Sequence, residues 1–367
     1  MDKEHRKPKA TTIRDVAHAA NVSPAAVSRY LSNQLQLPVP TKSRIDAAIE
    51  ALNYVPNAMA RRLSLNSSET IGFITSDIVN SFFALIASAA EEAASRAGYS
   101  LTILNSRNDI DRELQFLSRI DDRQFDGVLL LTNHVDDGRL RTKINANRRV
   151  VLLDEDVPGA VAPRLFAENQ TGADLATAHL IEHGHKRIAY VGGPRGLLSG
   201  EERLKGFRQA HAKALLDVDE RLVFSGPYDE RVAYDSFRQL WAGGEPPTAI
   251  FSGGDLLALG IMQAARDMHL RIPRDFSLVS FDDIPHAALF DPPLTTVRQS
   301  TQDFGQRGVG LLLDLINHEV HAPDTLRIPV SLMVRGSVAA PPRSHRTVHD
   351  GGAGKAQHIG AQKVEGV

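Results

Sequence analysis

Acidic residues follow four short apolar runs in the larger, C-terminal part of the sequence. They stand directly after TIGFITS, VVLL, FSGG and VSF and are Asp77, Asp154, Asp255 and the adjacent pair Asp282 and Asp283. Carboxylates at strand ends can accept paired hydrogen bonds from the vicinal hydroxyls of a sugar. They can instead cap the helix that follows, and this is the role we predict for Asp255. The pattern indicates a polar ligand site built from strand ends.

The same residue types give little support to catalysis or to a metal site. Asp282 and Asp283 are neighbours, whereas general acid–base catalysis needs two carboxyl groups at a defined separation across the reacting bond. His179 and His183 have helical spacing and His185 follows them, but the zinc motif requires a Glu directly after the first His, and that Glu is absent. We interpret His185 as a helix-end residue that bonds backbone. The sequence predicts a protein that is not an enzyme and carries no cofactor.

A second set of candidate residues lies near the N-terminus, on the outward face of a short helical pattern. Ser23 can cap this helix, and its outward positions are Pro24, Ala25, Ser28 and Arg29. Small side chains let a helix approach base edges in the major groove, where Arg29 can bridge O6 and N7 of guanine. Pro24 and Ala25 can contact a thymine methyl group. The alternative is a small helical bundle in which Arg29 is merely solvated.

Two further helical patterns flank this one. Thr12 can cap a first helix whose apolar residues repeat at helical spacing over 13–20, and a third pattern starts at Thr41, after LQLPVP. Residues 1–62 contain ten Lys/Arg and five Asp/Glu, against 32 and 39 in the remainder. Three short helices in a basic head predict a helix-turn-helix domain.

The stretch YVPNAMARRLSLN links this head to the rest of the chain. Asn57 can cap a helix over 58–63, but two turns are too few for stability in water, so the segment should fold only against a partner. Arg61 and Arg62 can reach DNA phosphates, and Leu63 is a large apolar side chain without a core of its own. The alternative is an ordinary basic linker.

From residue 70 onward, short apolar runs alternate with helical patterns. The strand-like runs include TIGFIT, SLTILN, FDGVLLLT, KRIAYVGG, TAIFSGGD and FSLVSFDD. This alternation predicts an α/β body with parallel sheets, in which ligands bind at the carboxyl ends of the strands.

The runs TIRDVAHAANVSPAAVSRYLSN and YVPNAMARRLSLN closely resemble the head and hinge of the lactose repressor/galactose repressor family of bacterial transcription regulators. The similarity extends over residues 11–338. It implies an all-α helix-turn-helix head at 11–55, a hinge at 56–66, and at 67–338 an effector-binding and dimerisation domain of two periplasmic-binding-protein-like subdomains. Residues 1–10 are expected to be a disordered arm, and the polar, Gly-rich residues 339–367 a disordered tail.

The resemblance assigns roles to the head and hinge. Pro24, Ala25 and Arg29 occupy the base-reading positions. Tyr54 and Asn57 contact the DNA backbone, and Leu63 inserts into a central minor-groove step of a pseudo-palindromic operator. Pro24 departs from the polar residues often found there, so the half-site sequence is not carried over. The predicted DNA-binding residues are Thr12, Ser23, Pro24, Ala25, Ser28, Arg29, Tyr54, Asn57, Arg61 and Leu63.

The resemblance also assigns roles in the body. Arg203, in RLKGF, matches an arginine that bonds ligand oxygens, and Tyr228 falls where an aromatic ring stacks on the ligand. Phe82 and Phe83 fall where side chains of the first subdomain close over it, although two Phe at a helix start are often only core. The predicted effector-binding residues are Phe82, Phe83, Asp154, Ser199, Arg203, Tyr228, Asp282 and Gln299.

Two positions depart from the family pattern and bear on the effector. Gly254 replaces an Asn common in sugar-type members and matches the purine type, and Glu168 stands where the family usually has Asp. A sugar or sugar derivative is favoured because Asp154, Arg203 and Asp282 together suit several hydroxyls. A purine-type co-repressor is the alternative, and a sugar-binding receptor without DNA function is disfavoured by the head.

Length and composition limit the remaining possibilities. The 367 residues, 42% of them hydrophobic, are enough for two or three folded units. The apolar runs are too short to span a membrane and the start lacks a signal-peptide pattern, so we expect a cytoplasmic protein. The sequence has no cysteine, which excludes disulfides and thiolate metal sites. The tail lacks a leucine heptad for tetramerisation, so a homodimer is predicted.

Overall fold

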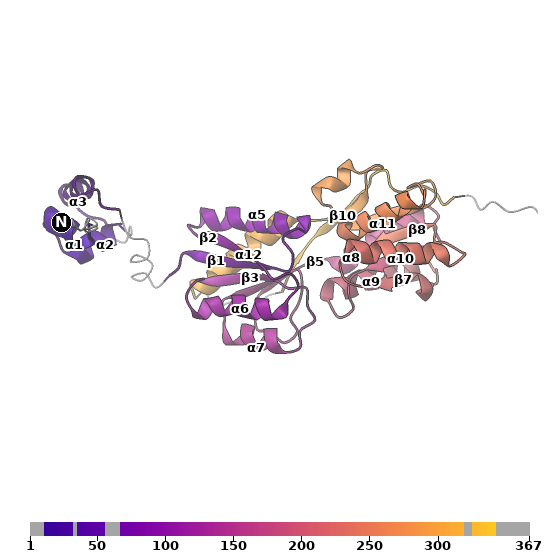
Figure 1. Ribbon diagram of the computed structural model, residues 1–367, viewed down its shortest axis with the longest axis horizontal. Coiled ribbons are helices and arrows are strands. Elements are labelled where there is room, and N and C mark those ends of the chain that lie inside the picture. Colours follow the sequence, from indigo (N-terminus) through magenta and orange to yellow (C-terminus); the bar gives the residue numbers. More distant parts are fainter. Residues whose placement is uncertain (1–10, 32–34, 56–66, 319–324, 343–367) are drawn as a thin grey trace, which may run out of the picture.

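The computed structural model describes residues 11–31, 35–55, 67–318 and 325–342, which form a helical head and an α/β body with two sheets (Figure 1). The predicted arm, the predicted hinge and most of the predicted tail lie outside the described residues. Asn57, Arg61, Arg62 and Leu63 lie there too, so their proposed roles stay predictions. Among the described helices, none is both long enough and apolar enough to cross a bilayer.

The head consists of α1 (Ile13–Ala20), α2 (Pro24–Leu31) and α3 (Val39–Ala51). Their inward faces form a separate small core of Val16, Ala17, Ala20, Val27, Ile45 and Ala48. The hydroxyl of Tyr30 donates to Asp46 Oδ1 at 2.7 Å and so joins α2 to α3. The predicted start of α3 at Thr41 is wrong, because the helix already begins at Val39. Pro40 fits its first turn, where a missing N–H costs no intrahelical hydrogen bond.

Local caps explain where the first two helices begin. Asp15 Oδ2 accepts hydrogen bonds from the backbone N–H of Thr12 at 2.8 Å and from its hydroxyl at 2.7 Å. Ser23 Oγ accepts the N–H of Ala26 at 3.1 Å, and α2 starts at the following proline. Asn21 ends α1 with a left-handed backbone, φ 53°. The helix starts predicted at Thr12 and Ser23 are confirmed.

The described part of the first subdomain contains a sheet of six parallel strands in the order β11-β5-β4-β3-β1-β2. Side chains alternate along each strand, so Phe73 packs under α5 and α12 while Ile74 packs under α6 and α7. Helices on both faces explain why the central strands are apolar throughout. The elements are β1 (Thr70–Thr75), α5 (Ser81–Arg96), β2 (Ser100–Asn105), α6 (Ile110–Asp121), β3 (Gly127–Leu131), α7 (Arg139–Ala146), β4 (Val150–Leu153), β5 (Arg164–Ala167), α12 (Thr301–Ile316) and β11 (Thr325–Ile328).

The described part of the second subdomain contains a sheet in the order β12-β10-β9-β8-β6-β7. Helices α8 and α9 cover one face, and α10 and α11 cover the other. Its strands are parallel except β12, which runs antiparallel to β10 and departs from the predicted parallel arrangement. The elements are α8 (Asn169–Glu182), β6 (Ile188–Gly192), α9 (Leu198–Lys213), β7 (Val223–Ser225), α10 (Glu230–Ala242), β8 (Ala249–Ser252), α11 (Asp255–Asp267), β9 (Ser277–Asp282), β10 (Thr295–Gln299) and β12 (Val330–Met333), with 3-10 turns at Glu220–Leu222 and Pro285–Leu289.

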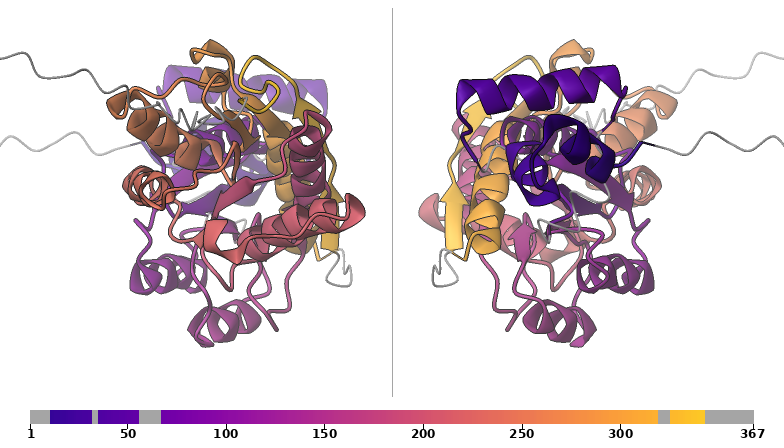
Figure 2. Two further views of the ribbon diagram at one scale, coloured as in Figure 1. Left: turned by 90° about the vertical axis from the view of Figure 1, so that its right-hand side faces the viewer. Right: turned by 90° about the vertical axis from the view of Figure 1, so that its left-hand side faces the viewer.

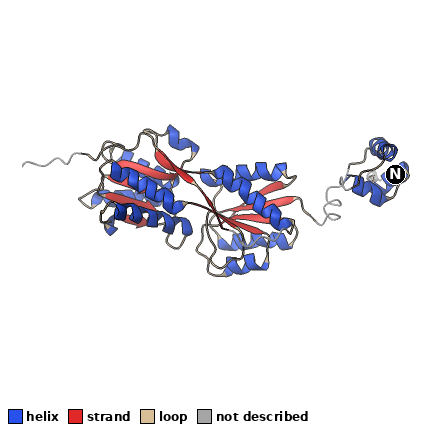
Figure 3. Cartoon of the chain, turned by 180° about the vertical axis from the view of Figure 1, so that it is seen from behind, coloured by secondary structure: helices blue, strands red, loops and turns tan. Residues whose placement is uncertain are grey.

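Within the described residues, the chain crosses three times between the subdomains. The crossings follow β5, β10 and β11 and lie at residues 168, 300 and 329. Figure 2 views the body end-on and Figure 3 from behind, and both show helices outside the strands of each subdomain. Since each crossing leaves the carboxyl end of a strand, the polar residues that follow these strands lie where the subdomains meet.

The ordered body extends past Val338, beyond which a disordered tail was predicted. The N–H of Ala339 donates to Ser277 Oγ at 3.0 Å, and its carbonyl oxygen lies 2.8 Å from Nε2 of His185. These bonds attach the end of the described chain to the second subdomain. At least Ala339 is therefore part of the body.

Candidate functional site

Polar and aromatic side chains meet where the carboxyl ends of the two sheets face each other. Asp154 follows β4 in the first subdomain, and Asp282 and Gln299 end β9 and β10 in the second. Two further members lie at the start of α9 and one precedes α10. We call this group the strand-end cluster; its members are Asp154, Glu155, Ser199, Arg203, Tyr228, Asp282 and Gln299. All but Glu155 were predicted from the sequence.

Arg203 lies at the centre of the strand-end cluster and is only 3% exposed. Its Nε donates to Asn169 Oδ1 at 2.8 Å and its Nη1 to the carbonyl oxygen of Gly253 at 2.6 Å. The guanidinium lies 3.9 Å from the centroid of the Phe281 ring, and Nη1 is 3.7 Å from Asp282 Oδ1. Arg203 is therefore held rigidly, and its shortest hydrogen bonds go to neutral acceptors.

Asn169 is a functional candidate that the sequence analysis missed. It is fully buried at the start of α8, directly after the crossing at residue 168. Its side-chain oxygen accepts a hydrogen bond from Arg203 and so fixes the orientation of that guanidinium in the strand-end cluster. The available signal was a polar residue at a strand-to-helix junction in AENQTG, directly after Glu168.

The adjacent acids Asp282 and Asp283 do not share a site. Both have left-handed backbones, with φ 113° and 59°, conformations that non-glycine residues rarely adopt. Asp282 Oδ1 accepts the Gln299 amide at 2.7 Å, whereas Asp283 accepts from Arg298 at 2.7 Å and from Arg335 at 2.6 Å. Asp282 thus belongs to the strand-end cluster and Asp283 to a structural ion-pair network.

Glu155 connects the two subdomains directly. Its carboxylate accepts both the N–H of Ser199, at 3.2 Å, and the Ser199 hydroxyl, whose oxygen lies 3.0 Å from the hydroxyl oxygen of Tyr228. A second link joins Arg327 of β11 to both carboxylate oxygens of Glu202 on α9, each at 2.6 Å. The sequence pattern singled out Asp154, the first acid of the run LLDED. The next acid, Glu155, makes the contact with Ser199.

Asp154 has an unpartnered oxygen atom. Its side chain is buried, with 7% of the residue exposed, and Oδ1 has no hydrogen-bond partner among the described residues. The backbone is again left-handed, with φ 68°. Because buried polar atoms are nearly always paired, this oxygen is a candidate contact for a bound molecule.

Burial controls the protonation of these acids. It raises the pKa of Glu155 to about 8, assisted by the charge of Asp154 and opposed by the hydrogen bonds from Ser199. Burial also raises the pKa of Asp282 to about 8, against the lowering effect of Arg203, and it raises the pKa of Asp154 in the same way. One buried cation therefore faces three buried carboxyl groups, of which Glu155 and Asp282 favour their protonated forms near neutral pH.

Tyr228 packs closely against two glycines. A Cβ atom added to Gly193 would lie 2.3 Å from its ring, which no real packing allows. A Cβ at Gly254 would lie 3.4 Å from Asp282 Oδ2 and 3.7 Å from the Tyr228 ring. Gly254, where sugar-type members commonly have Asn, therefore borders both the Asp282 carboxylate and the Tyr228 ring. A larger residue at this position would project into the strand-end cluster.

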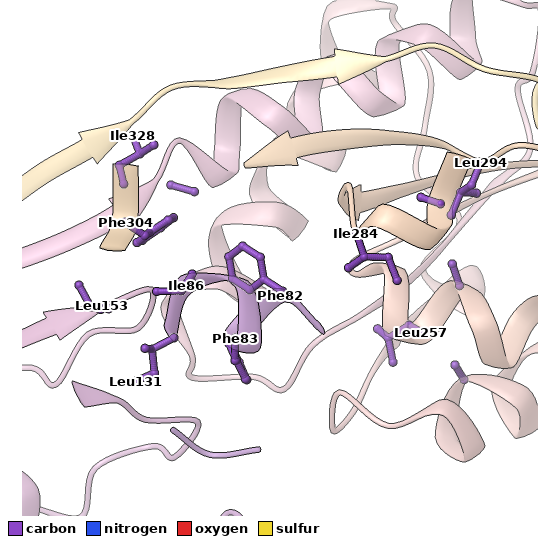
Figure 4. Packing of buried hydrophobic residues seen from close by; sticks show 14 of the residues in the cluster. Phe82, Phe83, Ile86, Leu131, Leu153, Leu257, Ile284, Leu294, Phe304 and Ile328 are labelled. Atoms are coloured by element: carbon purple, nitrogen blue, oxygen red, sulfur yellow. The ribbon is translucent and has the colours of Figure 1, made fainter. Parts of the chain in front are cut away.

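Phe82 and Phe83, predicted to contact the effector, are buried at the start of α5. They are 3% and 9% exposed, and Phe82 meets the ring of Phe304 edge-on at 6.1 Å between centroids. They share one apolar cluster with Ile284 of the second subdomain, and Figure 4 shows Phe82 between Phe304 and Ile284. Apolar packing at the subdomain junction is their structural role, and effector contact stays a prediction.

Two other strand-end acids make local contacts. Asp77 Oδ1 accepts a backbone N–H two residues on, at 3.0 Å, within the turn before α5. The capping role predicted for Asp255 is wrong, because the preceding glycine is the N-cap of α11. The Asp255 carboxylate instead accepts the N–H of Ile284 at 2.9 Å and the Thr296 hydroxyl at 2.8 Å, which holds the loop after β9.

Three histidines, His179, His183 and His185, make contacts within the second subdomain. The two ring nitrogens of His185 lie 2.9 Å from the Thr248 hydroxyl and 2.8 Å from the Ala339 carbonyl, so it does bond backbone, although not in its own turn. The rings of His179 and His183 lie 4.4 Å apart between centroids. In the part of the chain that the structure describes, no group of three or more His, Asp or Glu side chains is placed to hold a metal ion.

The outward face of α2 is available for a partner. Pro24, Ala25 and Arg29 are exposed, and Ser28 is half-buried beside them. The Nε of Arg29 donates a long hydrogen bond, 3.4 Å, to the carbonyl oxygen of Ala25. Thr12 is exposed at the start of α1, and Tyr54 is half-buried against the head core. The outward face of α2 thus carries small side chains around Arg29, while its inward face packs in the head core.

Comparisons with known proteins agree with both parts of this architecture. Residues 12–57 match the family described as bacterial regulatory proteins, lacI family, and residues 177–338 match a periplasmic binding protein-like domain. The HTH-type transcriptional repressor PurR of Mannheimia succiniciproducens is 33% identical over 328 residues, covering 89% of this chain and 98% of that protein. A PurR of Escherichia coli O1:K1 is 32% identical over 338 residues, covering 90% and 98%.

Two solved structures extend the similarity to ligand complexes. A lac repressor dimer bound to operator and the anti-inducer ONPF is 27% identical with a TM-score of 0.79, covering 90% of this chain and all of that one. A complex of the transcriptional regulator CelR with cellobiose is 30% identical with a TM-score of 0.69, covering 89% and 99%. Head and body thus occur together in the matched proteins.

Proposed function

This chain belongs to the lacI family of bacterial regulatory proteins, and from that premise we propose a homodimeric transcription repressor whose operator affinity is set by a small polyhydroxylated effector. The effector binds at the strand-end cluster. The observation that carries the proposal is the buried, unpartnered Asp154 oxygen between the subdomains of a chain with a helix-turn-helix head. The regulated genes serve carbohydrate uptake or catabolism.

The DNA-binding role rests on the outward face of α2. In the proposed complex Arg29 donates two hydrogen bonds to a guanine, and Pro24 and Ala25 contact a neighbouring base pair. The basic head neutralises phosphates, so operator affinity should fall steeply with salt. Two heads on a symmetric dimer require a pseudo-palindromic operator with half-sites about one helical turn apart.

The effector role rests on the acceptors and the ring of the strand-end cluster. Asp154 and Asp282 present carboxylate oxygens, Arg203 presents guanidinium donors, and the Tyr228 ring offers a flat surface for the apolar face of a sugar. A molecule with several hydroxyls can satisfy both kinds of polar group. This favours a sugar or sugar derivative.

Regulation couples the two sites through closure of the body. Glu155, a member of the strand-end cluster, and Arg327 each contact the other subdomain. We infer that an effector bound at the cluster changes how the subdomains meet. We propose that this change alters the approach of the two predicted hinges, 56–66, in the dimer. The coupling is reciprocal: an inducer that weakens operator binding is itself bound more weakly by the operator complex.

A purine-type co-repressor is the second candidate effector. Gly254 matches the purine type at a position that borders Tyr228, and two relatives named PurR are 32% and 33% identical to this chain. A purine ring can stack on Tyr228 and donate N–H groups to the carboxylates. In that case the effector strengthens operator binding instead of weakening it.

Fluorescence anisotropy of the full-length protein on its own upstream DNA tests the proposal. We expect binding that weakens steeply with salt, and one sugar in a panel of sugars, sugar acids and purines that releases the DNA. Tightening by a purine supports the second candidate, and salt-independent binding argues against a repressor.

An Arg29→Met variant tests the reading face of α2. It should lose about 1–3 kcal/mol of operator affinity and show relaxed preference at one base pair. Arg44→Met, at an exposed position of α3, is the matched control for the loss of one positive charge. Equal losses in the two variants would exclude base reading by Arg29.

A further inference from the structure

Carboxyl groups outnumber cationic groups in the strand-end cluster. Asp154, Glu155 and Asp282 contribute three carboxyl groups, and Arg203 is the one cationic side chain among the cluster's members. Arg203 gives its two short hydrogen bonds to Asn169 and to a backbone carbonyl, and its distance to Asp282 is 3.7 Å. The acids at Asp154 and Glu155 therefore lack a cationic partner within hydrogen-bond distance in the described structure.

The unused polar atoms of the strand-end cluster are acceptors. Within the part of the chain that the structure describes, Asp154 Oδ1 and Gln299 Oε1 are buried without a hydrogen-bond partner, on residues 7% and 3% exposed. Glu155 is 2% exposed, and its carboxylate accepts its hydrogen bonds from Ser199. A ligand that pairs with the ionised Asp154 oxygen and with Gln299 Oε1 acts as a donor toward both.

We propose that the effector carries a positively charged amino group, which binds between the carboxylates of Asp154 and Glu155. This inference rests on the proposed function, because it concerns the effector of the same site. An ammonium group supplies three donors and one positive charge, so it pairs with the Asp154 oxygen and, by displacing the proton of Glu155, forms an ion pair with that carboxylate. The chemical class is an amino sugar, or another polyhydroxylated compound with a primary amine.

A neutral polyol fits this part of the strand-end cluster less well. Its hydroxyls can donate to Asp154, but they leave two adjacent buried acids to be neutralised by protons. The charged and titratable groups that face Glu155 are Asp154 from the same loop, Arg203 from α9 and Tyr228 from the segment before α10. Burial raises the pKa of Glu155 to about 8, so a cationic effector must displace a proton that a neutral effector leaves in place.

The test uses triads of related compounds with the full-length protein. Each triad contains a hexose, its 2-amino derivative and its N-acetylated derivative, in the gluco, galacto and manno series. Isothermal titration should show one amino compound binding at least about tenfold more tightly than both neutral members of its triad. Its affinity should rise by up to about tenfold between pH 6 and pH 7, with proton release, because one bound proton is displaced.

Two variants locate the effect. Glu155→Gln removes the charge but keeps the side-chain shape, and it should abolish both the preference for the amine and the rise of affinity with pH. Glu201→Gln removes an exposed carboxylate from the first turn of the same helix that carries Ser199, and it should retain both.

The outcomes separate the inference from the proposed function. Equal binding of amino and neutral compounds, or no binding of any amino compound, overturns the inference. Operator binding by the same preparation is measured without any added compound. If the protein binds its upstream DNA and responds only to neutral compounds, the repressor assignment stands and the inference alone is wrong; if it binds no DNA, either alone or with the sugars, amino sugars and purines added, the proposed function fails independently.

Discussion

Replacing Glu155 with Gln should make the stability of the ligand-free protein less dependent on pH. Burial raises the pKa of Glu155 from 4.5 to about 8. Between these values the folded state binds a proton that the unfolded state has released, so the free energy of unfolding decreases as the pH rises. The decrease is about 1.4 kcal/mol per pH unit, or about 2 kcal/mol from pH 6 to pH 7.5, where the folded group begins to titrate.

Urea unfolding at these two pH values measures the difference. The single tryptophan, Trp241 on α10, reports on the second subdomain, and circular dichroism reports on the whole chain. Glu155→Gln should lose about 2 kcal/mol less than the wild type over this interval, and the exposed control Glu201→Gln should follow the wild type. Identical losses in Glu155→Gln and the wild type would refute the reasoning, since they would mean that Glu155 is already ionised in the folded state.

Three further substitutions test separate parts of the structure. Ser23→Ala removes the cap of α2 and should destabilise the head by about 1 kcal/mol, measured by hydrogen exchange of head amides. Arg203→Lys cannot keep both short hydrogen bonds and should cost about 1.5–3 kcal/mol in urea unfolding, with loss of effector binding. Gly193→Ala should displace the Tyr228 ring and weaken effector binding by about tenfold or more in calorimetry, whereas Gly310→Ala, which points into open space, should leave it unchanged.

Local sequence patterns predicted the elements well because their causes are local. The caps at Thr12 and Ser23 start α1 and α2, and the alternation of apolar runs with helical patterns corresponds to the strands and helices of the body. The start of α3 was misplaced because a proline inside the first turn looks like a loop residue. The few residues of β12 do not predict its antiparallel direction, because that direction is defined relative to the neighbouring strand β10.

The sequence also predicted most members of the strand-end cluster, but not their partners. The position of Asp154 and Asp282 after strands placed them at the carboxyl ends of the sheets. The contact of Glu155 with Ser199 joins residues 44 positions apart and depends on how the two subdomains meet. The same holds for Asn169 and Arg203, whose hydrogen bond connects α8 to α9.

Sequence by itself determined the helical head, the α/β body, the family and the residue types available for binding, because caps, periodicity and motifs act over a few neighbouring residues. Only the tertiary structure decided that Asp283 and Asp255 serve loops and ion pairs, while Asp282 bonds Gln299 in the strand-end cluster and Glu155 contacts the other subdomain. It also decided which carboxyl groups are buried and hold protons near neutral pH. Burial and charge pairing depend on the surroundings in space, and in this chain those surroundings are assembled from segments that cross repeatedly between two sheets.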